Sequence, residues 1–232
     1  MADNDDEDEA LVGRVRDAFA EWIALVRSAL RVDRVTDWTF TPSLWPDDSA
    51  WTAIVTRRVM PAARSAFARA AGALDVAASR LTNSWDQLTT ATGGLLPAAG
   101  WPARLFTAVQ RAWDGAAQRA ADVRAAVAEV LTMERWRPIS DLSGHQLAHV
   151  VRQAATQAAA SVLAAAGTPL TKTWMPRADE RVRAEHRQAR GQTVPVSEPF
   201  EVGGFPLMYP GDPTAPPHLS INCRCRMTVR RA

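Results

Sequence analysis

Apolar residues recur at helical spacing over the first two thirds of the chain. The first stripe advances by three or four residues at a time and consists of Leu11, Val15, Phe19, Trp22, Val26 and Leu30. Such spacing places the side chains on one face of an amphipathic helix that packs into a core. A second helix is expected from about residue 49 to residue 90, with Asp47 or Asp48 as its cap. Pro61 should kink this helix, because proline removes a backbone donor and clashes with the preceding turn.

Two further helices are predicted before residue 168. One covers residues 102–130, where apolar and small residues follow a pattern close to a heptad. A loop containing Pro138 should follow it. Ser143 and Gln146 then form a capping-box pattern at the start of the next helix, which Gly167 should end.

The composition changes near residue 190. Almost all alanines precede that point, whereas seven of the 15 prolines follow Gly191. Alanine favours helix, and proline and glycine favour turns and short segments. We therefore expect a mainly α protein with long, partly kinked helices and a small α+β carboxy-terminal domain that contains short antiparallel strands. The predicted organisation is an acidic disordered leader (1–10), a helical body (11–167) and the carboxy-terminal domain (168–232).

The last residues show the clearest strand pattern of the chain. Residues 172–174 are expected to be extended, 179–186 to form a short helix with an Asp179–Arg183 pair, and 193–205 to form two short strands. Residues 222–230 alternate between two faces, and this period of two indicates a half-buried strand. The inward face is Cys223, Cys225, Met227 and Val229, and the outward face is Arg224, Arg226, Thr228 and Arg230.

The charges are unevenly distributed. Lys and Arg number 27 against 25 Asp and Glu, but six of the acids lie in the first nine residues, and Lys172 is the only lysine. Arginine binds phosphate well, although a GC-rich genome also encodes arginine by default. The candidate DNA contacts are Arg224, Arg226, Arg230 and Arg231. The alternative is a solvated edge strand whose charges prevent edge-to-edge pairing.

Several classes of protein are disfavoured. No apolar run approaches the roughly 18 residues of a membrane span, so no membrane association is expected. The acidic start is unlike a signal or transit peptide. Two cysteines provide no disulfide framework, which is typical of a reducing cytoplasm.

His186, Cys223 and Cys225 are a candidate metal site. Two cysteines at i and i+2 on a strand point the same way, and zinc accepts Cys and His ligands. His218 or Asp179 would be the fourth ligand. We favour the alternative of buried thiols beside a hydrogen-bonded histidine and expect no cofactor, because structural zinc sites usually have wider cysteine spacing. His145 and His149, four residues apart, are interpreted as a solvated or capping pair.

An enzyme is the second functional hypothesis. A metal- or thiol-dependent hydrolase would use the same Cys223, Cys225 and His186. The alternation turns both thiols inward, which indicates inert cysteines rather than an exposed nucleophile.

An ordered series of motifs over about sixty residues resembles the carboxy-terminal domain of phage head-morphogenesis proteins, the Mu F-like minor capsid family. The motifs are Lys172-Thr173-Trp174, the run from Asp179 to His186, Gly191-Gln192, Glu198-Pro199-Phe200, Gly203-Gly204, Pro210-Gly211-Asp212-Pro213 and Asn222-Cys223-Arg224-Cys225. The single positions taken as motif residues are Trp174, Asp179, Arg181, Arg183, His186, Gly191, Pro210, Gly211, Asp212, Asn222, Cys223 and Cys225.

The family often carries an Arg-Thr-Glu-like stretch in the preceding helix. This chain has Arg152-Gln153-Ala154-Ala155-Thr156-Gln157 there, so no role of that stretch carries over. Within the domain, the resemblance leads us to expect a hydrogen bond from His186 to the segment 222–225. It also leads us to expect ion pairs of Arg181 and Arg183 with Asp212 or Glu198.

The resemblance implies a non-enzymatic, minor structural protein of a tailed-phage head. It would be made in the host cytoplasm and reside in the virion, in the capsid interior near the portal. Its partners would be the portal, the major capsid or scaffold proteins and, without sequence specificity, packaged DNA; no small-molecule substrate is expected. The protein would assist head assembly, genome packaging or ejection. A third hypothesis is an adaptor whose helical body binds the partner while residues 168–232 only anchor it.

Overall fold

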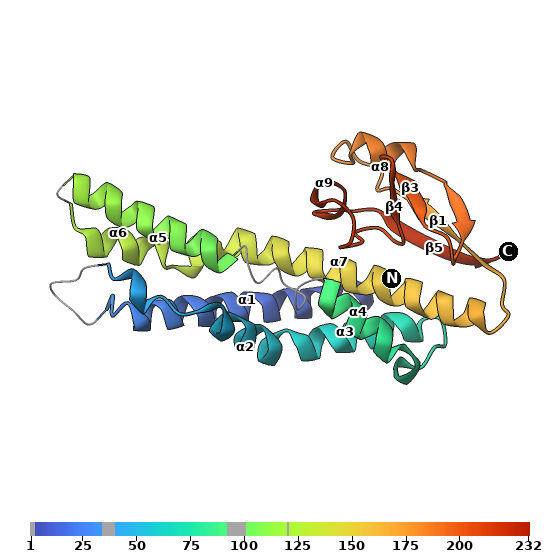
Figure 1. The fold of residues 1–232 in the computed structure, drawn as a ribbon, viewed down its shortest axis with the longest axis horizontal. Helices are drawn as coiled ribbons and strands as arrows, with labels where there is room; N and C mark the ends of the chain where they lie inside the picture. Colours follow the sequence, from blue (N-terminus) through green and yellow to red (C-terminus); the bar gives the residue numbers. More distant parts are fainter. Residues whose placement is uncertain (1–2, 34–39, 92–100, 120) are drawn as a thin grey trace.

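One long helix, α7 (Met133–Ala165), runs through the middle of the molecule (Figure 1). The computed structural model describes residues 3–33, 40–91, 101–119 and 121–232. Helices α1, α3 and α4 pack against one side of α7, with α2 packed on α1 and α3, and the carboxy-terminal domain lies on the opposite side. The elements before α7 are α1 (Asp3–Ala29), η1 (Pro42–Leu44), α2 (Asp48–Arg58), α3 (Met60–Gly72), η2 (Ala78–Leu81), α4 (Thr82–Ala91), α5 (Trp101–Gln118) and α6 (Val123–Val130).

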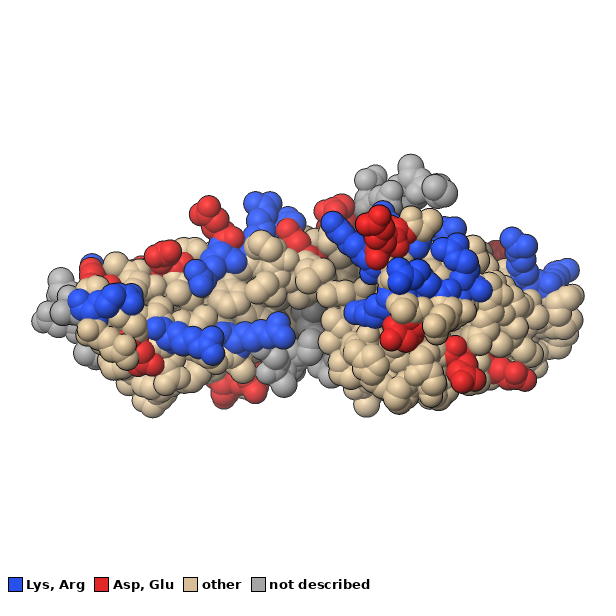
Figure 2. Space-filling model, turned by 90° about the horizontal axis from the view of Figure 1, so that it is seen from above, with Lys and Arg blue, Asp and Glu red and all other residues tan. Residues whose placement is uncertain are grey.

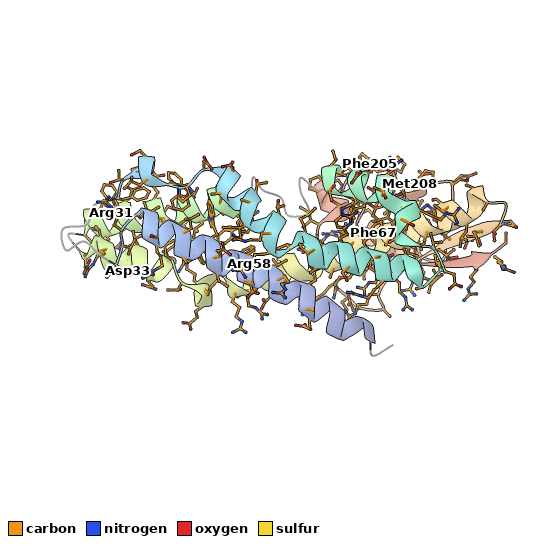
Figure 3. The ribbon with its side chains drawn as sticks, turned by 90° about the horizontal axis from the view of Figure 1, so that it is seen from below. Arg31, Asp33, Arg58, Phe67, Phe205 and Met208 are labelled. Carbon is orange, nitrogen blue, oxygen red and sulfur yellow. The ribbon has the colours of Figure 1, made fainter. Side chains whose placement is uncertain are left out.

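Helix α1 lies along α7 and buries the apolar stripe seen in the sequence. It begins at Asp3, so its backbone takes in most of the segment expected to be a disordered leader. Seen from below, α1, α2 and α3 cover this side of the molecule (Figure 3). Arg58, at the end of α2, donates a hydrogen bond from Nε to Oε2 of Glu21 in α1 at 2.7 Å.

The single kinked helix expected over 49–90 is wrong. Asp47 does cap α2, accepting a hydrogen bond from Ala50 N, but α2 ends at Arg58 and α3 begins at Met60. Pro61 is the second residue of α3, where its missing N–H has no helical partner to lose, so it starts a helix instead of bending one. After α3, Asp75 takes a positive φ of 57° and turns the chain toward η2 and α4.

The continuous helix expected over 102–130 is also wrong. Helix α5 ends at Gln118, and α6 begins after Asp122, whose side chain accepts from Ala125 N at 3.0 Å. The two helices pack against each other as a hairpin at one end of the molecule (Figure 1). Asp122 is thus an N-cap signal inside what otherwise resembles one heptad pattern.

Helix α7 starts ten residues earlier than the predicted cap and includes Pro138. Ser143 is not a cap: its Oγ donates to Ile139 O at 2.8 Å within the helix. Gly144 lies where α7 crosses α1, and a Cβ there would be 2.8 Å from the Cα of Val12. The close approach of the two helices therefore requires this glycine. The helix ends as expected before Gly167, which has a φ of 91°.

The carboxy-terminal domain contains two small antiparallel sheets, as the fold prediction requires. The first has the order β2-β1-β5 and the second is the hairpin β3-β4. The elements are β1 (Leu170–Met175), α8 (Ala184–Gln188), β2 (Thr193–Pro195), β3 (Phe200–Val202), β4 (Phe205–Leu207), α9 (Pro217–Ser220) and β5 (Arg226–Arg231). The expected helix over 179–186 shrinks to α8, because the Asp179 side chain accepts from Arg181 N at 3.0 Å and holds a turn.

Two separate hydrophobic cores lie on either side of α7. The core of the helical body is rich in tryptophan: Trp101 stacks on Trp136 at 5.0 Å between ring centroids, and Trp51 meets Phe19 edge-on at 5.6 Å. The smaller core of the carboxy-terminal domain includes Trp174, Cys223 and Cys225. The two parts of the molecule therefore meet along α7.

Candidate functional site

A row of polar side chains on α7 faces the carboxy-terminal domain. Gln146, His149, Gln153 and Gln157, called here the α7 stripe, follow one another at steps of three, four and four residues, so they share one helix face. Gln146 Nε2 donates to Ser220 O at 3.2 Å, and Gln157 Nε2 donates to Val196 O at 3.0 Å. Gln153 Oε1 accepts from Met227 N at 3.0 Å, which satisfies a donor on the outer edge of β5. The stripe therefore joins the two parts of the molecule by polar bonds.

Lys172 extends this contact from the other side. Its Nζ donates to Gln157 Oε1 at 2.9 Å and to Met208 O at 2.8 Å, and lies 5.0 Å from the centroid of the Phe200 ring. The side chain is completely buried. Burial lowers the pKa of Lys172 to about 8, and the nearby negative charge of Asp212 only partly opposes this.

Asp212 holds the turn that follows β4. Its carboxylate accepts from Met208 N and from Thr214 N, each at 2.9 Å. Gly211 in this turn has a φ of 82°, and a Cβ at that position would be 3.1 Å from His149 Cδ2. The Pro210-Gly211-Asp212 motif thus shapes a turn whose glycine leaves room for a side chain of the α7 stripe.

His186, Cys223 and Cys225 come together in the core of the carboxy-terminal domain. His186 Nδ1 is 3.2 Å from Cys225 Sγ and 3.7 Å from Cys223 Sγ, and the three potential ligand atoms all lie within 4.8 Å of one another. The exposed fractions of the residues are 2%, 3% and 1%. The predicted hydrogen bond between His186 and the segment 222–225 is confirmed, and so is the inward direction of both thiols.

His149 adjoins this cluster. Its imidazole lies close enough to Cys223 to influence that thiol, and its Nε2 is buried with no hydrogen-bond partner among the described residues. The Cys225 thiol donates to Cys223 and so lowers the pKa of Cys223, as do the imidazoles of His149 and His186. The same bond between the sulfurs, together with burial, raises the pKa of Cys225. The two pKa values are therefore shifted in opposite directions, and the two sulfurs lie beside the imidazole of His186.

The two fourth ligands considered from the sequence lie elsewhere. His218 meets the Phe205 ring at 6.2 Å between centroids. Asp179 accepts from Arg224 Nη2 at 2.6 Å, which commits its carboxylate to an ion pair. Neither residue belongs to the close group of His186, Cys223 and Cys225.

Other expected pairings within the domain are wrong. The guanidinium of Arg183 donates to Ile221 O at 2.7 Å, and in the part of the chain that the structure describes it forms no ion pair with Asp179, Asp212 or Glu198. Arg224 bonds Asp179, so it does not belong to a free outward row. Among the outward cations of the last strand, Arg226, Arg230 and Arg231 are exposed. Seen from above, basic side chains gather over the carboxy-terminal domain, with a few acidic ones among them (Figure 2).

The sequence interpretation missed the α7 stripe and, with it, His149. His145 is exposed, as a solvated residue would be, but His149 is half-buried against Gly211 and Cys223. A signal was present: glutamines and a histidine at helical spacing run beside an apolar face, and such a row is typical of a helix with a polar partner.

Comparison with known proteins places these motifs in a family. Residues 114–228, about half of the chain, match the family model described as Phage Mu protein F like protein. No curated protein and no solved structure matches the chain. Among the described residues, no helix is long and apolar enough to cross a membrane. From Asp114 in α5 to Thr228 in β5, the chain belongs to the phage Mu protein F like family, a family of phage head morphogenesis.

Proposed function

We propose that the protein is a minor structural component of a tailed-phage head that associates with the portal or the capsid interior. There it assists head assembly, genome packaging or ejection. The observation that carries the proposal is the extent of the family match. It covers α6, α7 and the carboxy-terminal domain through the first half of β5, and therefore includes both sides of the contact made by the α7 stripe.

The range of residues that the family model matches suggests different roles for the two parts of the molecule. The family region supplies a common unit, built from α7 and the domain that the α7 stripe fastens to it. Helices α1 to α4 lie on the opposite side of α7 and outside the matched residues. We assign binding of a phage-specific partner protein to the face formed by α1 to α4. In this respect the proposal includes the adaptor hypothesis, in which the helical body binds the partner.

Association with the portal can be tested by co-expression. The chain would be produced with the portal protein and, separately, with the major capsid protein encoded in the same genome, and each mixture would be separated by size. We expect the chain to comigrate with the portal assembly or with the capsid protein at a reproducible ratio. Elution of the chain alone from both mixtures would contradict the proposed association.

Contact with packaged DNA is a second part of the proposal. Arg226, Arg230 and Arg231 present exposed guanidinium groups on and beside one edge of the domain. Such groups bind phosphates without sequence preference, and the binding weakens as salt rises. The ion pair of Arg224 with Asp179 makes this residue a minor contributor.

A duplex-binding titration at about 50 mM and about 200 mM salt tests the DNA contact. Replacing Arg226, Arg230 and Arg231 by glutamine should weaken binding and flatten its salt dependence. The matched control replaces Arg104, Arg111 and Arg135, exposed arginines of α5 and α7, by glutamine. Equal losses in the two triple variants, or no binding by the unaltered chain at the lower salt, would overturn the contact.

The hydrolase alternative receives no support from the geometry. A thiol nucleophile has to meet its substrate, whereas both sulfurs lie in the core of the carboxy-terminal domain. The family is one of structural head proteins, which favours a non-enzymatic role.

A further inference from the structure

We propose that His186, Cys223 and Cys225 bind one zinc ion with His149 of α7 as the fourth ligand, so that the metal fastens the carboxy-terminal domain to α7. The ligands come from three parts of the chain: α7, α8 and the segment just before β5. Two thiolates and two imidazoles form a ligand set that structural zinc sites use.

The spacing of the three close ligands fits tetrahedral zinc. Zn–S bonds of about 2.3 Å and Zn–N bonds of about 2.0–2.1 Å place a sulfur and a nitrogen about 3.5 Å apart in that geometry. The observed distances from His186 Nδ1 to the two sulfurs, 3.2 and 3.7 Å, lie on either side of this value. Burial of all three residues matches a closed structural site rather than a catalytic site with an open position.

His149 is the fourth ligand because of its position and its unused nitrogen. Each glutamine of the α7 stripe bonds a backbone or side-chain group of the carboxy-terminal domain, whereas His149 Nε2 is buried without a partner among the described residues. A buried polar group of this kind is costly unless something binds it. His149 lies outside the close group of three but acts on the Cys223 thiol, so its ring has to move toward Cys225 and His186 to complete the site.

Binding replaces protons by the metal. Zinc coordinates thiolates, so both cysteines enter the complex without their protons, which pass to the solvent, and no redox change is involved. Because the ligands are brought together only in the folded chain, the metal stabilises the fold and the docking of the domain on α7. Metal removal should therefore loosen the contact between the α7 stripe and the carboxy-terminal domain before the helical core unfolds.

The first experiment measures metal in the full, untagged chain. After incubation with zinc and removal of the excess, we expect about one zinc per chain by elemental analysis. Cobalt in place of zinc should show the intense visible bands of a tetrahedral site and a sulfur-to-cobalt charge-transfer band. Less than about a tenth of an equivalent of zinc, or a cobalt spectrum without the thiolate band, would overturn the proposal.

The second experiment tests the assignment of His149. His149→Ala is compared with His145→Ala, which removes an exposed imidazole one turn away on the same helix. We expect His145→Ala to bind zinc as the unaltered chain does. Mutating a residue that only orients a ligand typically lowers metal affinity by about 10–100-fold. His149→Ala should lower zinc affinity by more than this and should also alter the cobalt spectrum. Unchanged affinity and spectrum in His149→Ala would overturn the role of α7 in the site.

Discussion

At the scale of single residues, the contact between α7 and the carboxy-terminal domain depends on a few buried polar atoms. Lys172 is the only lysine of the chain, and its ammonium lies between Gln157, the Met208 carbonyl and the Phe200 ring. A neutral amine still donates both hydrogen bonds, so the site tolerates loss of the proton. Burial therefore favours the neutral form without breaking the contact.

This leads to a pH-dependent prediction for Lys172→Met. The pKa of Lys172 falls to about 8 in the folded chain, from an ordinary value of 10.5 in the unfolded chain. Between these values the unfolded chain binds more protons, so the contribution of this group to stability rises with pH. Lys172→Met lacks this contribution. The destabilisation caused by the substitution should therefore grow between about pH 7 and pH 10, which urea unfolding at each pH measures. A cost that is constant or falls over this range would contradict the assigned pKa shift.

At the scale of elements, the sequence predicts whether a segment is helix or strand better than it predicts where helices break. The extended segment expected at residues 172–174 lies within β1, and the helix stops at Gly167 as its glycine predicts. The strand expected over 222–230 begins only at Arg226, because Asn222 takes a positive φ of 55°, so the two buried cysteines lie before the strand. The sequence does not predict the helix breaks at residue 59 and at Asp122, because the apolar period continues across both. At Asp122 a helix-cap signal competes with a strong helical pattern. The early start of α7 is similar, because Pro138 predicts a loop there, whereas the packed helix accommodates this proline.

The contact between α7 and α1 gives a prediction with a built-in control. In Gly144→Ala the new Cβ would meet the Cα of Val12 at 2.8 Å, and backbone cannot move aside cheaply. Overpacking of this kind costs about 1–3 kcal/mol, more than the about 1 kcal/mol that alanine gains over glycine in a helix. Gly13→Ala adds its Cβ to open space on α1 beside the same crossing.

Urea unfolding of the two variants separates packing from propensity. Gly144→Ala should be less stable than the unaltered chain, and Gly13→Ala more stable by up to about 1 kcal/mol. If both substitutions stabilised the chain, the close approach of α7 to α1 would be refuted.

At the scale of the whole molecule, α7 is the element that both halves share. Its apolar face completes the helical core, and the α7 stripe on its other side holds the carboxy-terminal domain. The family match spans α7 and that domain together. The motifs in the sequence identified the domain itself, but its attachment depends on residues such as His149 and Gln157, whose partners lie far away in the sequence. Only the folded chain brings these partners to one helix face.

The most direct test of the proposed role is quantitative mass spectrometry of purified, DNA-filled heads of the phage that encodes this chain. The account predicts that the protein is present in the particles, in far fewer copies than the major capsid protein. It should also remain after external proteins are removed by protease treatment of intact heads. Absence of the protein from empty and DNA-filled heads alike, while the major capsid protein is abundant, would contradict a structural role in the head.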